Sequence, residues 1–163
     1  MQTITSRFMV GAALTLATAF VARGAEEKIS PDKLPKAVAD ALKVRFPGGT
    51  LVSASKDSEK GQVVYDVELK QKDRKYETDI KEDGTMLEVE KEIAIKDVPA
   101  AVTKGVETKY PKSTIREVME VDKVKGKEEK PDHYEVSIET SSKKKLEVTA
   151  SLDGKKVEEA TGD

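Results

Sequence analysis

The side chains in this sequence that could do chemistry are many carboxylates and one histidine. The chain of 163 residues has 31 Asp and Glu against 29 Lys and Arg, a single histidine at His133, and no cysteine. Without cysteine it cannot form disulfides, thiolate zinc sites or a cysteine nucleophile. No P-loop, G-x-G-x-x-G or H-E-x-x-H motif is present, and no G-x-S-x-G or S-x-x-K arrangement with a base nearby stands out. We therefore expect a protein that is not an enzyme, with no catalytic residue and no cofactor.

His133 allows two interpretations. It lies at the predicted start of a strand, beside a predicted charged loop at Lys123–Asp132, and points to the side opposite Tyr134. The sequence favours a solvent-exposed histidine with an ordinary pKa. A catalytic or pH-sensing role is the alternative, because histidine titrates near neutral pH.

Carboxylates alternate with apolar residues along three predicted strands. If the apolar side chains point toward a helix, the residues between them share the other face: Asp66, Glu68, Glu77, Asp79, Glu88 and Glu90. The carboxylates on such a face would repel one another unless Lys70, Lys75 and Lys91 lie between them or a cation binds. Three interpretations stay open: a solvated face that keeps the sheet soluble, a surface for a basic protein or peptide, and a weak Ca²⁺-type site. We assign these six carboxylates, with His133 and Glu135, as candidate partner-binding residues and assign no metal ligand, since no calcium-loop spacing is present.

The elements that must position these residues occur twice. The segment L-P-K-A-V at Leu34 recurs as V-P-A-A-V at Val98, and the same offset of 64 residues relates Phe46-Pro47 to Tyr110-Pro111. In each copy, apolar residues at every fourth position predict a helix with one buried face, which the second proline ends. We expect a duplication.

Strands follow each helix. Alternation around Tyr65–Leu69, Tyr76–Ile80 and Leu87–Val89 predicts three strands, after a weaker one at Thr50–Ser55, and Asp83-Gly84 predicts a hairpin turn. The second copy repeats this order, with Asp153-Gly154 as its turn. The expected fold is α+β, with two tandem repeats of one helix and a roughly four-stranded antiparallel meander, the helices packed on one face of the sheet. Because about 60 residues are marginal alone, the two units should share one continuous sheet or pack tightly together.

The N-terminal segment has the pattern of a secretory signal peptide. One arginine precedes an apolar stretch from Phe8 to Ala22, and Ala22-Arg23-Gly24 offers small residues for cleavage after Gly24. We predict a signal peptide at residues 1–24 and a periplasmic or secreted protein, with no membrane association after cleavage. The remaining 139 residues (163 less 24) carry 27 basic and 31 acidic groups. This mildly acidic balance argues against a nucleic-acid partner.

Three segments together resemble the PepSY-like family of small exported bacterial domains. They are L-P-x-A-V-x-x-A-L-x-x-x-F-P-G-G from Leu34 to Gly49, then Y-D-V-E-L, then D-G-T-M-L-E-V-E from Asp83 to Glu90. That family is similar in fold to each half of the beta-lactamase-inhibitor protein. The resemblance spans Lys33–Glu159 and implies repeats at residues 30–92 and 95–160. The second copy departs from the pattern, since Gly105 matches Ala41 and no glycine pair follows Pro111.

The resemblance implies a non-catalytic module that binds or inhibits a protein or peptide through the open face of its sheet. No residue that contacts a lactamase can be carried over, because no motif here defines one. The alternative function is a periplasmic cation-binding or envelope-stress protein that uses the same acidic face. The identity of the partner and the oligomeric state do not follow from the sequence.

Overall fold

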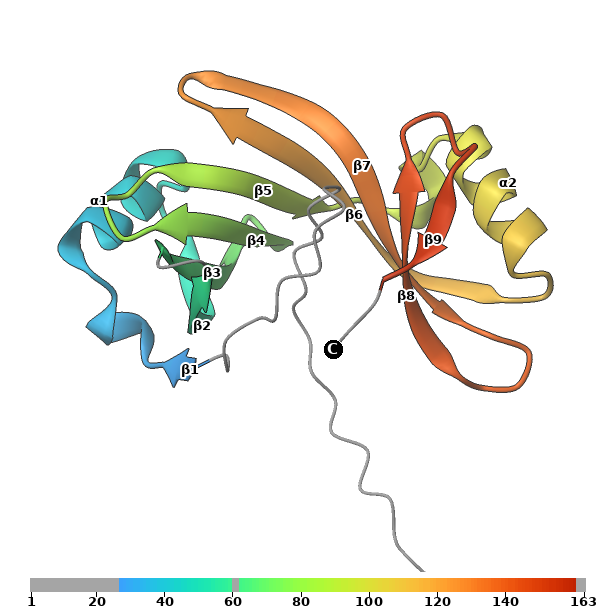
Figure 1. The fold of residues 1–163 in the computed structure, drawn as a ribbon, viewed down its shortest axis with the longest axis horizontal. Coiled ribbons are helices and arrows are strands. Elements are labelled where there is room, and N and C mark those ends of the chain that lie inside the picture. Colours follow the sequence, from blue (N-terminus) through green and yellow to red (C-terminus); the bar gives the residue numbers. More distant parts are fainter. Residues whose placement is uncertain (1–26, 60–61, 161–163) are drawn as a thin grey trace, which may run out of the picture.

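The computed structural model describes residues 27–59 and 62–160, so the predicted signal peptide lies outside the described residues. Two α-helices, two short 3-10 helices and nine strands follow one another in this part of the chain (Figure 1). Their bounds are β1 Glu27–Ile29, η1 Pro31–Lys33, α1 Lys36–Arg45, β2 Thr50–Glu59, β3 Gln62–Gln71, β4 Arg74–Lys81, β5 Met86–Glu92, η2 Ile95–Asp97, α2 Ala100–Lys109, β6 Thr114–Lys125, β7 Glu128–Glu139, β8 Lys145–Ser151 and β9 Val157–Glu159.

All nine strands form one sheet in sequence order, and each is antiparallel to the next. The α+β class is confirmed. The shared sheet is also confirmed, because β5 pairs with β6 from Glu88↔Lys123 to Glu92↔Met119. The segments before and after Ile95–Asp97 are thus joined by backbone hydrogen bonds as well as by the chain.

Each helix begins after a proline and ends before one. Pro35 and Pro99 are the N-cap residues of α1 and α2. Phe46 and Tyr110 are the C-caps, and each donates its backbone N–H to the carbonyl four residues earlier. Proline disfavours helical conformation in the residue before it, so Pro47 and Pro111 set these ends.

The helices cover the same face of the sheet with two hydrophobic cores. Val38 and Leu42 of α1 pack with Val67 and other residues of β2–β5, and Val102 and Val106 of α2 pack with residues of β6–β9. The ladder places Val89 of the first core opposite Asp122 of β6. Alternation along β6 then puts Val118 of the second core on the same side as Val89. Both cores therefore lie on one face, and the opposite face carries mostly polar side chains, with Met119 and Val121 of β6 among them.

The stretch Lys123–Asp132 is a hairpin and not the charged loop that the sequence suggested. β6 continues to Lys125 and β7 begins at Glu128, with Gly126 in the left-handed conformation (φ 64°) at the turn. The hairpin reaches back to the first core, where Val124 packs and where Arg45 Nη2 lies 2.7 Å from Glu129 Oε1. Its charged residues show no alternation of apolar and polar side chains, so the sequence predicts no strand there. The strand predicted at Thr50–Ser55 is likewise longer, and β1 was not predicted.

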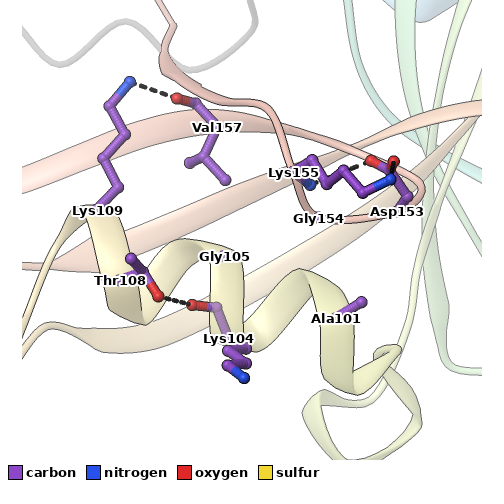
Figure 2. A pocket seen from close by; sticks show the side chains of 9 residues that line it. All are labelled: Ala101, Lys104, Gly105, Thr108, Lys109, Asp153, Gly154, Lys155 and Val157. Atoms are coloured by element: carbon purple, nitrogen blue, oxygen red, sulfur yellow. Dashed lines mark hydrogen bonds and ion pairs between the residues drawn. The ribbon is translucent and has the colours of Figure 1, made fainter.

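Glycine lets the last turn of the sheet touch α2 (Figure 2). Gly154, at φ 67°, occupies the predicted Asp153-Gly154 turn. A Cβ added at Gly105 would lie 2.1 Å from the Gly154 carbonyl oxygen. Beside this contact, Lys109 Nζ donates to the carbonyl oxygen of Val157. The first copy has Ala41 at the corresponding position of α1, so the departure Ala41 to Gly105 has a steric reason.

Candidate binding face

The six predicted carboxylates of β3–β5 lie together on the face away from the helices, which we call the acidic face. Cross-strand pairing arranges them in two rows across three strands: Asp66↔Asp79↔Glu88 and Glu68↔Glu77↔Glu90. The second row continues through Val121 of β6 to His133 of β7. Glu135 lies two residues further along β7, so it shares this face.

Much of the acidic face is buried, which corrects its interpretation as a solvated surface. Glu88 is 3% exposed, Glu90 7% and Glu135 5%. The sheet is strongly twisted between β4 and β8 (Figure 1). Side chains from non-adjacent strands come into contact on this face. Lys75 of β4, for example, lies 3.3 Å from Glu117 of β6, although β5 runs between these strands. Alternation shows which face a side chain occupies but not this convergence.

Two lysines neutralise part of the face. Lys75 Nζ lies 2.7 Å from Glu77 Oε1, and Lys123 of β6 pairs with Glu88. Lys123 was not expected here, because the sequence predicts a loop for its segment. Lys91, expected to interleave with the carboxylates, points to the helix side and pairs with Glu120 at 2.6 Å and Asp122 at 3.2 Å.

Five carboxylates from four strands interact at the centre of the face, and we call them the acidic cluster: Glu77, Glu88, Glu90, Glu135 and Glu147. Glu147 of β8 was not among the predicted residues. Its signal was available, because the apolar residues Leu146 and Val148 on either side predict that Glu147 points away from the helix. Glu135 is the common member, acting on each of the other four.

The cluster holds more carboxylates than nearby cations can balance. Burial, and then repulsion from Glu135, Glu77, Glu88 and Asp79, raises the pKa of Glu90 to about 10. Burial and repulsion from Glu135, Glu77 and Glu117 raise the pKa of Glu147 to about 7. The pKa of Glu88 is also raised by burial, even though Lys123 opposes the effect. At neutral pH, Glu90 therefore keeps its proton.

His133 is buried inside β7, and the expectation of an exposed histidine is wrong. Its side chain is 3% exposed, and its Nδ1 lies 2.8 Å from Asp132 Oδ2. Its Nε2 lies 3.7 Å from Glu135 Oε1. Burial alone would lower the pKa of His133, but the nearby carboxylates of Glu135 and Asp132 outweigh burial and raise it. His133 pairs with Val121 of β6 and Ser151 of β8, and the bulge at Asp132 lies directly before it.

Several buried polar atoms of this region lack a hydrogen-bond partner among the described residues. They are Glu88 Oε1, Glu135 Oε1, His133 Nε2 and Thr149 Oγ1. His133 and Thr149 also line a cavity of about 140 Å³, together with Asp132, Ser151, Lys156 and Glu158. Buried polar groups are normally satisfied. This arrangement therefore leaves hydrogen-bonding capacity for another molecule.

No group of three or more His, Asp or Glu in residues 27–59 and 62–160 is arranged to hold a metal ion. No helix within these ranges is long and apolar enough to cross a bilayer.

Two overlapping parts of the chain, residues 22–87 and 63–156, match a family model described as "Putative beta-lactamase-inhibitor-like, PepSY-like". The chain belongs to the PepSY-like family. The match agrees with the segments that carried the resemblance in the sequence, and the observed α+β sheet is the fold expected from it. No curated protein shows significant sequence similarity to the chain.

Solved structures share this fold. A BLIP-like protein from Bacteroides fragilis is 22% identical with a TM-score of 0.54, over 79% of this chain and 89% of that one. A protein from Bacteroides eggerthii, named as a putative periplasmic protein, is 15% identical with a TM-score of 0.57, over 77% of this chain and 88% of that one. A DUF2874 family protein from Bacteroides uniformis is 14% identical, again with a TM-score of 0.57, and the match covers 77% of this chain and 88% of that one.

Proposed function

We propose that this PepSY-like protein is an exported, non-catalytic module that binds a basic protein or peptide through the acidic face. The observation that carries the proposal is the buried acidic cluster, in which five carboxylates face two lysines and a histidine. Complementary charge on a partner would supply the missing cations. The partner chemistry is thus a surface rich in Lys or Arg, and inhibition of an enzyme is one form that such binding could take.

Export and duplication belong to the same proposal. The similarity to a protein named as periplasmic and the signal-peptide pattern at residues 1–24 support export. Each helix is followed by four strands, α1 by β2–β5 and α2 by β6–β9. This order, with the 64-residue sequence offset, supports tandem repeats at residues 30–92 and 95–160.

Binding of a Ca²⁺-type cation is the weaker candidate. The arrangement of the described residues offers no three-ligand group for a metal ion, whereas calcium takes six to eight oxygen ligands. The buried side-chain oxygens that lack a partner among the described residues are also spread over four strands, β5 to β8. Hydrogen-bond donors of a partner protein suit this spacing better than one ion does.

The test compares captured partners between two variants. Immobilised protein would be incubated with envelope extract, and bound proteins identified by mass spectrometry. The double variant Glu90→Gln, Glu135→Gln removes two acidic groups of the cluster while keeping their size. Glu128→Gln is the matched control, because Glu128 is exposed at the β6–β7 hairpin and outside the cluster. The captured protein is then purified for direct affinity measurements.

We expect the purified partner to be basic, and to bind the wild type and Glu128→Gln alike but the double variant more weakly. Rim charges govern the association rate, so salt should slow the binding of the wild type. Equal affinity of the partner for wild type and double variant would place the interaction elsewhere on the molecule and overturn the proposal.

A further inference from the structure

A cavity of about 140 Å³ lies beside the acidic cluster, at the β9 end of the sheet. Its lining comes from β7, β8 and the segment that leads into β9: Asp132, His133, Thr149, Ser151, Lys156 and Glu158. The ladders pair His133 with Ser151 and Thr149 with Glu158, so these side chains point to the acidic face. The cavity therefore shares a face with the acidic cluster, but its lining contains no residue of that cluster.

The cavity has a buried end and an open end. His133 and Thr149 form the buried end, at 2% and 5% exposure. The side chains of Asp132, Lys156 and Glu158 are about half exposed and form the open end. A water molecule in the liquid takes about 30 Å³, so the volume admits a ligand of roughly four or five non-hydrogen atoms.

The charged groups of the lining are already paired with one another. Asp132 Oδ2 lies 2.8 Å from Nδ1 of His133, and Lys156 Nζ lies 3.0 Å from Oε2 of Glu158. The Ser151 hydroxyl also has partners, because it donates one hydrogen bond and accepts another within the turn that follows β8. A charged ligand would thus find no uncompensated charge in this lining.

What the buried end lacks is hydrogen bonds. His133 Nε2 and Thr149 Oγ1 are buried without a partner among the described residues, although both side chains line the cavity. The threonine hydroxyl can donate and accept, whereas Nε2 accepts in the neutral ring and donates in the protonated ring. A carboxylate offers no donor and an ammonium offers no acceptor. A primary amide offers both, on separate atoms, and can serve Nε2 in either state of the ring.

We propose that this cavity receives the primary amide of a glutamine side chain from the partner. The inference rests on the proposed function, since it names a second group by which the partner is recognised, next to the acidic cluster. The amide reaches His133 Nε2 and Thr149 Oγ1, and the methylene groups pass between the side chains of the open end. Glutamine suits the cavity better than asparagine because its longer side chain fills the volume and carries the amide to the buried end.

The experiment uses three small molecules as probes: propionamide, propionate and butylammonium. They are the side chains of glutamine, glutamate and lysine, each cut at Cβ. Binding to the ¹⁵N-labelled protein is followed by NMR titration, which measures weak affinities and locates the shifted amides. We expect propionamide to shift the amides of His133, Thr149 and their neighbours in β7–β9. It should bind at least about fivefold more tightly than either charged probe, since one hydrogen bond contributes about 1 kcal/mol.

Three variants separate the cavity from weak binding elsewhere. Thr149→Val keeps the shape of the side chain and removes its hydroxyl, so it should weaken propionamide binding at least about fivefold. Its folding should be at least as stable as that of the wild type in urea unfolding, because the lost hydroxyl is buried without a partner. Thr149→Ser keeps the hydroxyl and should retain binding. Thr114→Val is the matched control, because Thr114 is an exposed threonine at the start of β6.

Equal binding of propionate or butylammonium, shifts confined to residues away from the cavity, or equal affinity of propionamide for wild type and Thr149→Val would overturn the amide site. The captured partner should bind Thr149→Val more weakly than Thr114→Val, and equal affinity for these two variants would overturn the assignment to the partner. The proposed function is judged separately, by the double variant Glu90→Gln, Glu135→Gln. If the partner loses affinity for that variant, the proposed function stands even when propionamide does not bind.

Discussion

Replacing Glu90 with glutamine should stabilise the protein at neutral pH and leave its stability unchanged at pH 4. Burial of Glu90, and then repulsion from Glu135, Glu77 and Glu88, raises its pKa to about 10 in the folded protein. In the unfolded chain the pKa returns to the ordinary value of 4.5. Because the folded pKa is the higher one, the stability that Glu90 contributes is complete below pH 4.5 and is lost as the pH rises toward 10.

The magnitude at pH 7 follows from the unfolded state. Between 4.5 and 7 lie 2.5 pH units over which the unfolded chain gains free energy by ionising Glu90 while the folded protein does not. At about 1.4 kcal/mol per pH unit, this costs about 3 kcal/mol of folding stability. The side chain is 7% exposed, so solvent screens little of it. A glutamine has no proton to lose and escapes this cost, which is large against a total stability of roughly 5–15 kcal/mol.

Urea unfolding monitored by far-ultraviolet circular dichroism, at pH 4, 5.5, 7 and 8.5, measures the difference. Wild type, Glu90→Gln and the control Glu128→Gln would be compared at each pH. Other titrating groups are common to all three proteins and cancel in the comparison. The advantage of Glu90→Gln should be near zero at pH 4 and grow to about 3 kcal/mol at pH 7. An advantage that stays constant with pH, or a Glu90→Gln variant less stable than wild type at pH 7, would refute the protonated, buried Glu90.

Three further predictions concern the rest of the chain. Mass spectrometry of protein from the envelope fraction should find an N-terminus near Ala25, and an intact Met1 would contradict the signal peptide. Val102→Asp places an unpaired charge at a position with 0% exposure, which costs several kcal/mol of folding stability. Circular dichroism should therefore show the whole sheet unfolding. If the first half kept an unchanged melting transition, the two halves would be independent. Gly105→Ala should lower the free energy of unfolding in urea by about 1–3 kcal/mol, because the added Cβ would collide with the Gly154 carbonyl oxygen. Helix propensity alone predicts a gain in stability of about 1 kcal/mol. Thr103→Ala on the same helix serves as the control.

The elements with a strong hydrophobic period could be predicted from the sequence. Leu34, Val38, Leu42 and Phe46 recur every four residues, and each is buried in the first core. Tyr65, Val67 and Leu69 alternate with polar residues, and the predicted side of that strand faces α1. The prolines and the two Asp-Gly turns marked where the elements end.

The β6–β7 hairpin could not be predicted, because its strands extend beyond the cores. From Lys123 to Asp132 the chain is almost wholly charged and shows no alternation of apolar and polar residues. Backbone pairing with the neighbouring strand holds these residues, together with Val124 and the Arg45–Glu129 ion pair. Such contacts across 84 positions of sequence leave no local signal.

For the acidic face, too, the sequence predicts local properties of each strand but not properties that depend on several strands. Alternation assigned Glu88, Glu90 and Glu135 to one face, which is a property of each strand alone. Their burial depends on how β5 and β7 turn over β6, and this twist accumulates over several strands. The sequence therefore indicated which carboxylates lie together but not that they lose water, and His133 was misjudged for the same reason.

The free energy lost by burying these carboxylates is relevant to their proposed role in binding. A surface meant only for solubility would keep its carboxylates apart and hydrated, as Glu128 and Glu158 are. The acidic cluster instead brings Glu77, Glu90 and Glu135 from three strands into a region where ionisation opposes folding at neutral pH. A partner that brings positive charge would recover this free energy on binding. The same buried carboxylates that weaken the free protein would then strengthen the complex.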